Sequence, residues 1–453
     1  MLRKILSDYG MIFVLLALCV LFSVLTLKRQ MPEGPAAVRE LARQVQSEFR
    51  KSDTILAVGA VNTVSARLAE DVGERLDEVG FTGVRVVVGE PRDLRKALDA
   101  MDANSETLAA IVTAGDVVKW RVIEQISERY PRSADFELLT PRTKLWPDFL
   151  KRTNLLAIVD RIVVIAVIAI GMTMVIITAG IDLSVGSLIA LSAVVSTLLM
   201  KRLGGLEAPP WVVLVGFLAG MLSCGIVGAL GGFIVARFKV APFITTLSVM
   251  MMGRGLAFMI TGGFSIYQVP RTLTWLGQGS TAGIPNTVIL LVVLYAVAHI
   301  FMSRTRMGRY IYAVGGNEEA ARLSGVPVGL VIVFVYTVSA LAAGLGGCIQ
   351  ASQLNTGTPN MGVMYELYVI AAVVVGGTSL SGGAGRVLGT LIGAFIIAVI
   401  QNGMNLLGME SYTQQVVLGG VILGAVLLDK ARGGAGFSAI IPRQTEKQDV
   451  SQT

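Results

Sequence analysis

Apolar residues along this chain gather in long runs, most of them close to 20 residues, that are separated by short polar segments. Because an α-helix rises about 1.5 Å per residue, such a run can cross the roughly 30 Å of hydrocarbon in a bilayer. The runs lie at about residues 11–27, 155–178, 184–200, 211–236, 240–262, 286–303, 329–350, 366–380, 387–406 and 412–429. The pattern predicts an α-helical polytopic membrane protein with about ten transmembrane helices.

The segment after the first run has a different character. Of the chain's charged residues, 36 fall within residues 31–150, where 20 are acidic and 16 basic. Short apolar stretches typical of buried strands occur here, and each is followed by a segment with helical periodicity. The expected strands are 54–61, 84–89 and 108–114, and the expected helices are 64–79, 92–101 and 117–130. This alternation predicts a small α/β domain with a parallel sheet, inserted after the first helix.

These patterns divide the chain into four parts. Residues 1–29 hold an N-terminal segment and the first transmembrane helix, residues 30–150 the soluble insertion, residues 151–430 the transmembrane domain, and residues 431–453 a tail. No small-residue cleavage site follows the first apolar run, so we interpret it as a retained helix and not as a removed signal peptide.

Composition supports a membrane protein. Hydrophobic residues make up 53% of the chain and charged residues 15%, and the mean hydropathy is +0.69. The net charge of +7 does not indicate nucleic-acid binding. Most Lys and Arg residues are expected in the loops between membrane helices, where they determine the orientation of the protein. The three cysteines fall inside apolar runs without metal-ligand or disulfide spacing, and His299, the only histidine, lies near the end of a run.

Basic residues also predict the orientation. If the N-terminus is cytoplasmic, alternation of the helices places most basic loops inside, as the positive-inside rule requires, although Lys201 and Arg202 lie outside. The residues placed inside are Arg237, Lys239, Arg304, Arg306, Arg309, Arg322, Arg386, Lys430, Arg432, Arg443 and Lys447. Both termini are then cytoplasmic, and residues 30–150 are extracytoplasmic, compatible with a bacterial periplasm.

Two Gly-rich polar interruptions, at 180–186 (GIDLSVG) and 376–383 (GGTSLSGG), stand in corresponding halves of the membrane region. Non-helical backbone at membrane depth is tolerated only where protein or a water-filled cavity covers it. The pair therefore indicates inverted repeats with a pathway between them. Alternatively, single glycines serve only tight turns or close helix packing.

Three charged residues, Asp182, Arg254 and Glu366, lie inside or at the edge of apolar runs. An unpaired charge there costs several kcal/mol, so each is expected to face a cavity or a partner. They are candidates for the translocation pathway, and the alternative is that an Asp and an Arg pair simply to stabilise the bundle.

The loop at 304–328 contains a predicted short polar helix. Asn317 can cap it, Glu318 and Glu319 suit its first turn, and Gly325 with Pro327 ends it. On the cytoplasmic side such a helix is a candidate docking element, or else an ordinary connecting helix on the membrane surface.

The sequence lacks a G-x-x-x-x-G-K-[ST] phosphate loop, a Ser/His/Asp set and a metal-binding cluster. The chain is therefore predicted not to be an enzyme, and the energy for transport is expected from an ion gradient or from another subunit.

Three segments carry a resemblance to a known family: 177–195 (ITAGIDLSVGSLIALSAVV), 304–328 (RTRMGRYIYAVGGNEEAARLSGVPV) and 365–394 (YELYVIAAVVVGGTSLSGGAGRVLGTLIGA). They resemble the inner-membrane permeases of bacterial ATP-binding-cassette (ABC) sugar importers, of the ribose permease type within the branched-chain amino acid and ribose permease superfamily. The resemblance covers residues 10–28 and 146–430.

The resemblance implies a permease subunit, surrounded by membrane lipid, that translocates a simple sugar such as a ribose-like pentose or a hexose. It implies a homodimer or paired permease, cytoplasmic ATP-binding subunits that carry the ATP, and an extracytoplasmic sugar-binding protein. It places Asp182, Ser184, Thr378 and Ser379 on the translocation path. It also places the ATPase-docking helix at Asn317, Glu318, Glu319, Ala320, Ala321, Arg322, Leu323, Ser324 and Gly325.

The chain departs from the family pattern at three places. Tyr368 and Val369 replace the usual Asp and Ala, Ala384 interrupts the usual GGRG with an arginine at Arg386 instead, and residues 31–150 are additional. The insertion is expected to dock the binding protein, to sense substrate, or to act as a passive spacer. Other functions left open are an ion-coupled secondary transporter, a membrane receptor, and an importer of branched-chain amino acids or nucleosides.

Overall fold

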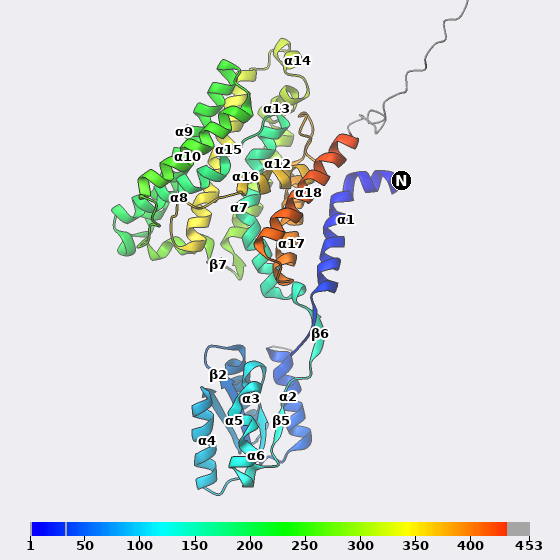
Figure 1. Cartoon of the computed structure of the whole chain (residues 1–453), viewed down its shortest axis with the longest axis vertical. Coiled ribbons are helices and arrows are strands. Elements are labelled where there is room, and N and C mark those ends of the chain that lie inside the picture. Colours follow the sequence, from blue (N-terminus) through cyan, green and yellow to red (C-terminus); the bar gives the residue numbers. More distant parts are fainter. Residues whose placement is uncertain (1, 32–33, 433–453) are drawn as a thin grey trace, which may run out of the picture. The chain divides into compact units, whose positions relative to one another are not determined.

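The computed structural model describes residues 2–31 and 34–432, so Arg443 and Lys447 of the predicted basic tail lie outside the described residues. The chain divides into two compact units, which are described separately (Figure 1). Unit 1 contains residues 1–26 and 149–453, and unit 2 contains Leu27–Asp148.

Unit 1 is helical, and each of the ten apolar runs lies wholly or mostly on a helix. Seven of the described helices are long and apolar enough to cross a membrane: α7 (Arg152–Ile177), α8 (Val185–Arg202), α9 (Pro210–Phe238), α10 (Pro242–Thr261), α12 (Asn286–Arg304), α15 (Val328–Leu354) and α17 (Val387–Leu406). Three more helices have shorter apolar parts: α1 (Leu2–Leu25), α16 (Tyr365–Val375) and α18 (Ser411–Arg432). Length and composition thus support a polytopic helical membrane protein.

The centre of unit 1 is formed by α7, α8 and α15. Nearly every residue of α7 from Ile162 to Ile177 is buried, and α15 packs against α7, α8 and α9. Glycine allows the α9–α15 contact, because a Cβ on Gly228 would lie only 2.7 Å from the Tyr336 carbonyl oxygen. Large apolar side chains on the outer faces of α9, α10 and α12 remain exposed, as expected for surfaces that contact lipid.

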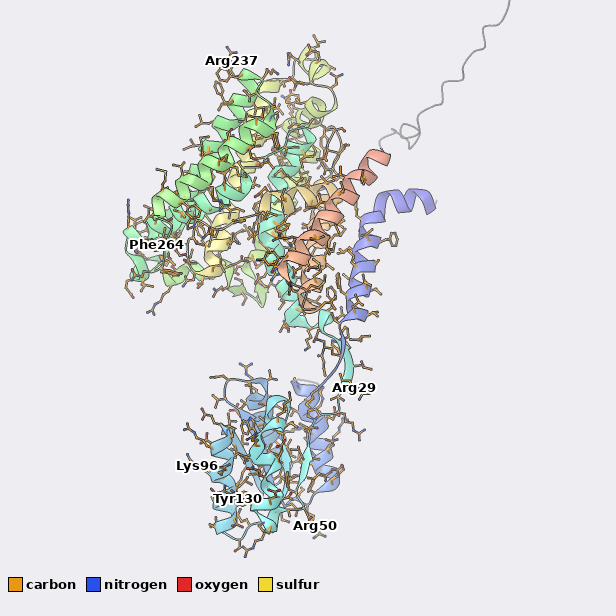
Figure 2. All side chains as sticks on the ribbon, viewed as in Figure 1. Arg29, Arg50, Lys96, Tyr130, Arg237 and Phe264 are labelled. Atoms are coloured by element: carbon orange, nitrogen blue, oxygen red, sulfur yellow. The ribbon has the colours of Figure 1, made fainter. Side chains whose placement is uncertain are left out.

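Shorter elements connect these helices. Between α12 and α15 lie α13 (Arg306–Gly316) and α14 (Glu318–Leu323). Between α10 and α12 lie a 3-10 turn (Arg271–Leu273), α11 (Thr274–Gly277) and a hairpin of β7 (Ser280–Thr281) and β8 (Ile284–Pro285). Arg237, near the end of α9, and Phe264, just after α10, lie at opposite ends of unit 1 (Figure 2).

Unit 2 is built on a parallel four-stranded sheet in the order β3 (Val84–Gly89), β2 (Thr54–Ala60), β4 (Leu108–Val112) and β5 (Glu137–Leu139). The three predicted strands correspond to β2, β3 and β4. Apolar residues of α2 (Pro35–Glu48) and α3 (Val64–Glu78) share one core cluster, and those of α4 (Pro91–Ala103), α5 (Arg121–Glu124) and α6 (Ile126–Arg129) share another. Helices therefore cover both faces of the sheet.

The predicted helix at 117–130 is wrong. Trp120 has an extended backbone (φ −70°, ψ 124°), which separates a 3-10 turn at Gly115–Lys119 from the one-turn helices α5 and α6. The apolar residues of this segment, among them Val117, Val122 and Ile126, still lie in a core cluster of the unit. The sequence reading also missed α2, the edge strand β5, and an antiparallel ribbon of β1 (Leu27–Gln30) and β6 (Lys144–Pro147).

Candidate functional site

The first helix break lies between α7 and α8. Ala179 adopts a left-handed backbone (φ 59°), and the chain is not helical again until Val185. Asp182 lies here, 1% exposed. One carboxylate oxygen accepts hydrogen bonds from the Ser184 backbone N–H (3.0 Å) and hydroxyl (2.6 Å), and the other accepts from the Ser339 hydroxyl of α15 (2.8 Å). Three donors thus hold the buried carboxylate in the break.

Arg254 and Glu366 meet at the beginning of α8. The Arg254 guanidinium of α10 donates to the carbonyls of Pro359 (2.7 Å), Met361 (2.6 Å) and Gly186 (3.3 Å). Glu366, in the first turn of α16, lies so close to Gly186 that a Cβ there would collide with its carboxylate. Arg254 therefore joins α8, α10 and the segment before α16.

Among the described residues, Asp182 and Arg254 form no ion pair with each other, so the expected Asp–Arg pair is wrong for these two residues.

The second break follows α16, which ends at Val375 and not near residue 380. Gly377, Gly382 and Gly383 have positive φ, a conformation that glycine adopts without steric cost. The Ser379 N–H donates to the Ala384 carbonyl (3.0 Å) and so closes a turn. Thr378 is fully buried, and its hydroxyl has no hydrogen-bond partner among the described residues.

The two breaks contact each other. The Gly383 N–H donates to the Ile177 carbonyl at the end of α7 (2.9 Å), and a Cβ on Gly382 would lie 3.0 Å from the Ala179 Cβ. Sequence reasoning foresaw two breaks, and the structure brings them together.

Helix α13 packs on this meeting point. A Cβ on Gly315 would overlap the Ile177 carbonyl oxygen, and a Cβ on Gly383 would lie 2.9 Å from the Gly316 Cα. The Tyr312 hydroxyl of α13 donates to the Gly385 carbonyl (2.8 Å). We call Ile177, Ala179, Gly315, Gly382 and Gly383 the break junction. The sequence analysis did not predict that α13 contacts the two breaks. The Gly315–Gly316 pair was the feature of the sequence that could have indicated this contact.

Helix α14 begins and ends where the sequence predicted. Asn317 caps it by accepting from the Ala320 N–H (2.9 Å), Glu318 and Glu319 occupy the first turn, and Gly325 follows it with φ 82°. Of the other predicted docking residues, Ala321 is buried, whereas Ser324 is exposed and Leu323 is 81% exposed.

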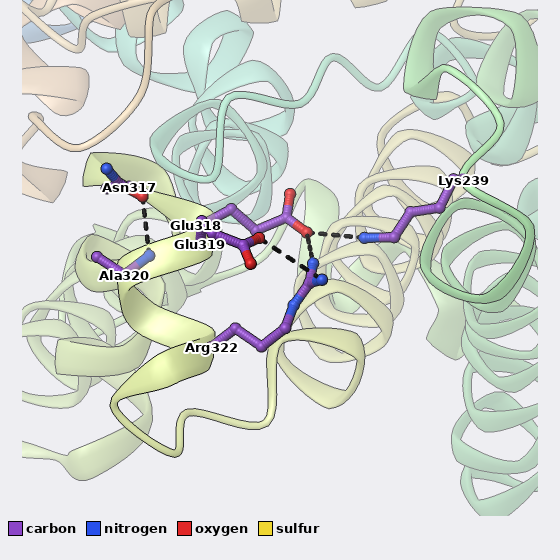
Figure 3. A network of polar contacts seen from close by, with 6 residues as sticks. All are labelled: Lys239, Asn317, Glu318, Glu319, Ala320 and Arg322. Carbon is purple, nitrogen blue, oxygen red and sulfur yellow. Dashed lines mark hydrogen bonds and ion pairs between the residues drawn. The ribbon is translucent and has the colours of Figure 1, made fainter.

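Charged side chains fix α14 to the end of α9 (Figure 3). Glu318 accepts from Lys239 (2.7 Å) and from Arg322 (2.6 Å), and Arg322 also lies 3.6 Å from Glu319. The hydrogen bond from Lys239 is the main cause that lowers the pKa of Glu318 below its ordinary value. We call these four residues the α14 cluster. Lys239 was predicted only as an orientation signal, and its distance from α14 in the sequence hid this contact.

The chemistry of these groups suits binding and movement. Hydroxyls, carbonyls and single charges surround the breaks, and the described residues contain no group of three or more His, Cys, Asp and Glu side chains that could hold a metal ion.

Residues 154–426 match the family described as branched-chain amino acid transport system / permease component. The chain belongs to this permease family.

Curated relatives of this chain are also named as permease proteins. The chain is 42% identical to the ribose import permease protein RbsC of Escherichia coli K12 over 292 residues, which cover 64% of this chain and 89% of that protein. It is 37% identical to the D-allose transport system permease protein AlsC of the same organism, over 62% of this chain and 85% of the relative. It is 35% identical to the L-arabinose ABC transporter permease protein AraH of Azospirillum brasilense, over 63% and 82%. No solved structure matches.

Proposed function

We propose that this chain is the permease subunit of an ABC importer that translocates a simple sugar, a ribose-like pentose or a hexose. The observation that carries the proposal is the 42% identity to a ribose import permease across 89% of that protein. Relatives named for allose and arabinose transport point to the same class of substrate. An extracytoplasmic binding protein would deliver the sugar, and a separate cytoplasmic subunit would hydrolyse ATP.

The proposed translocation pathway runs beside the two breaks. Asp182, Ser184, Thr378 and Ser379 belong to the breaks themselves, and Arg254 and Glu366 gather at the N-terminus of α8. Because Asp182 and Thr378 are buried, the pathway opens here only if the helices around the breaks separate. The Thr378 hydroxyl, which has no partner among the described residues, is then the group best placed to gain one.

The proposed docking element for the ATP-binding subunit is α13 together with α14. Leu323 supports this role, because a leucine 81% exposed on a short polar helix offers an apolar anchor for a partner. The contact of Gly315 with Ile177 would then transmit a displacement of α14 to the first break. Leu323→Ser is expected to weaken co-purification of the ATP-binding subunit by about tenfold.

A matched control for that variant is Leu206→Ser. Leu206 is also exposed, and it precedes α9, whereas Lys239 of the α14 cluster follows α9. A helix of that length separates the two sites by roughly 40 Å. Equal retention of the ATP-binding subunit by both variants would exclude α14 as the docking element.

We further propose ten spans with inverted repeats, both termini in the cytoplasm, residues 30–150 in the periplasm, and a homodimer or a pair of permeases. The separation of Arg237 from Phe264 supports this orientation, because Arg237 lies at one end of unit 1 next to the α14 cluster (Figure 2). The positive-inside rule assigns that end to the cytoplasm.

Affinity purification of the tagged chain from its native membrane, followed by mass spectrometry, tests the proposal first. A near-stoichiometric cytoplasmic protein with a phosphate loop is expected. Reconstitution of the complex with its binding protein should then give ATP-dependent uptake of labelled ribose, allose or arabinose. Uptake by the chain alone that follows a sodium or proton gradient would instead establish a secondary transporter.

A further inference from the structure

Unit 2 contains a pocket of about 420 Å³ between α2 and the segment that leads into β6. Arg39 and Arg43 line it from α2, one helical turn apart, and Arg142 and Lys144 line it from the chain after β5. Figure 1 shows α2 and α4 on opposite sides of this unit. The pocket therefore belongs to the α2 face of the sheet alone.

Four basic side chains and one carboxylate, that of Glu40, lie in the described lining of this pocket. Among the described residues none of them forms an ion pair, whereas Arg75, Arg85, Arg92 and Lys96 elsewhere in unit 2 each lie within 3.6 Å of a carboxylate. What distinguishes the pocket is that four basic side chains gather there, although residues 31–150 contain more acidic than basic residues. Like charges at i and i+4 on a helix repel, and a bound anion would relieve that repulsion.

Two further groups shape the pocket. The Glu40 carboxylate, the only acidic group among the described residues of the lining, accepts from the Arg142 backbone N–H (3.1 Å) and so fixes the segment at 142–144 against α2. The side-chain oxygen of Gln44 is buried and has no hydrogen-bond partner among the described residues. Gln44 lines the pocket, so this oxygen can accept from a ligand hydroxyl once the side chain turns toward the ligand.

We propose that this pocket binds a phosphate ester that carries neighbouring hydroxyls, of the glycerol phosphate type. Arginine forks match phosphate oxygens in a bidentate geometry, and a phosphate monoester carries about −1.5 to −2 charges at pH 7. The pocket volume is that of a small-molecule site, larger than one phosphate ion needs. An anionic phosphate next to glycerol hydroxyls occurs both in soluble glycerol phosphate, a monoester, and in the headgroup of phosphatidylglycerol, a diester with one negative charge.

The test uses the full chain in nanodiscs of neutral phosphatidylcholine, titrated with glycerol 3-phosphate in a calorimeter. The site variant is Arg39→Gln with Arg43→Gln. The control is Arg92→Gln with Lys96→Gln, which removes two basic residues at the same spacing from α4, on the other face of the sheet. Binding should weaken at least about tenfold in the site variant and less than about twofold in the control.

The source of the ligand is separated by repeating the titration in phosphatidylglycerol nanodiscs and by counting retained lipids with native mass spectrometry. Binding of glycerol 3-phosphate that the lipid does not weaken assigns a soluble ligand. Lipid retention that only the site variant loses assigns the headgroup. Equal binding by site variant and control, or no binding of either ester to the native chain, would overturn the proposal. Inorganic phosphate that binds as tightly as glycerol 3-phosphate would overturn the role given to the hydroxyls.

Discussion

Asp182 and Glu318 are both carboxylates of unit 1, but they lie in opposite surroundings. Asp182 is 1% exposed and is held by one backbone N–H and two serine hydroxyls. Glu318 is partly exposed and is held by two cationic side chains, from Lys239 and Arg322. A buried charge depends on complete hydrogen bonding, whereas an exposed ion pair contributes little to stability and leaves its residues free to exchange partners. The first arrangement suits a fixed break and the second a docking surface.

Removal of the buried carboxylate should have the largest effect. Asp182→Ala leaves three donors without an acceptor and is expected to lower the free energy of unfolding by about 3 kcal/mol, at roughly 1 kcal/mol per hydrogen bond. Thermal unfolding of the purified chain in detergent measures this. Asp182→Asn keeps one acceptor oxygen and should lose about half as much. An alanine variant as stable as the native chain would show that the break does not depend on this carboxylate.

Two neighbouring glycines test whether the break and the docking surface are connected. Gly315→Ala would press a methyl group against the Ile177 carbonyl, while Gly316→Ala meets nothing within 4 Å. Overpacking of this kind costs about 1–3 kcal/mol, so Gly315→Ala should destabilise the chain by about 2 kcal/mol.

The same two glycine variants distinguish an effect on the coupling of ATP hydrolysis to sugar transport from an effect on the stability of the chain. In the reconstituted transporter, Gly315→Ala should also reduce the sugar moved per ATP hydrolysed, because α13 no longer fits the break junction. Gly316→Ala should leave both quantities close to their native values. If the two variants moved the same amount of sugar per ATP hydrolysed, the proposed connection between α13 and the two helix breaks would be wrong.

The partly exposed carboxylate should contribute much less. Glu318→Gln removes two surface ion pairs and is expected to cost about 0.5 kcal/mol at pH 7. Because the folded-state pKa of Glu318 is lowered, its contribution is present above the ordinary value of 4.5 and disappears as the pH falls through the lower folded-state pKa. The difference in melting temperature between native and variant chains should therefore vanish in acid.

Glu319→Gln is the matched control for that measurement, because Glu319 has only the longer 3.6 Å contact with Arg322. Its effect at pH 7 should be smaller than that of Glu318→Gln. A difference for Glu318→Gln that grows in acid would contradict the assigned sign.

Removal of unit 2 should have the smallest effect on unit 1. Gln30 pairs with Lys144 at the end of the β1–β6 ribbon, so an Asn-Gly turn can replace residues 31–143 as a two-residue hairpin. The shortened chain is expected to insert into the membrane and to melt within about 1 °C of the native unit 1 transition, since the deletion removes no core residue of unit 1. Loss of the shortened chain from the membrane would show that the helical unit requires unit 2.

The elements of unit 1 were predictable because hydrophobicity and helix length are local properties. The apolar runs located the helices, the Gly-rich segments located both breaks, and Asn317 located the beginning of α14. Unit 2 was predicted less completely. A three-residue edge strand such as β5 is too short for its hydrophobic pattern to be detected. The extended backbone at Trp120 ends a helix at a position where no glycine or proline in the sequence indicates it.

The partners of the site residues were not predictable. Arg254 binds three backbone carbonyls, and Gly383 donates to the Ile177 carbonyl. Every residue has a carbonyl, so such contacts leave no residue-specific signal in a sequence. The expected pairing of Asp182 with Arg254 failed for that reason: opposite charges suggested a partner that serine hydroxyls and backbone groups supplied instead.

The β1–β6 ribbon also determines how unit 2 is connected to the helices on either side of it. Paired residues in an antiparallel ribbon have Cα atoms about 5 Å apart, so unit 2 begins and ends at nearly one point. The loop between α1 and α7 can therefore hold unit 2 without a change in the distance between the ends of these two helices. A whole domain thus makes the same geometric demand on the helical unit as a tight turn.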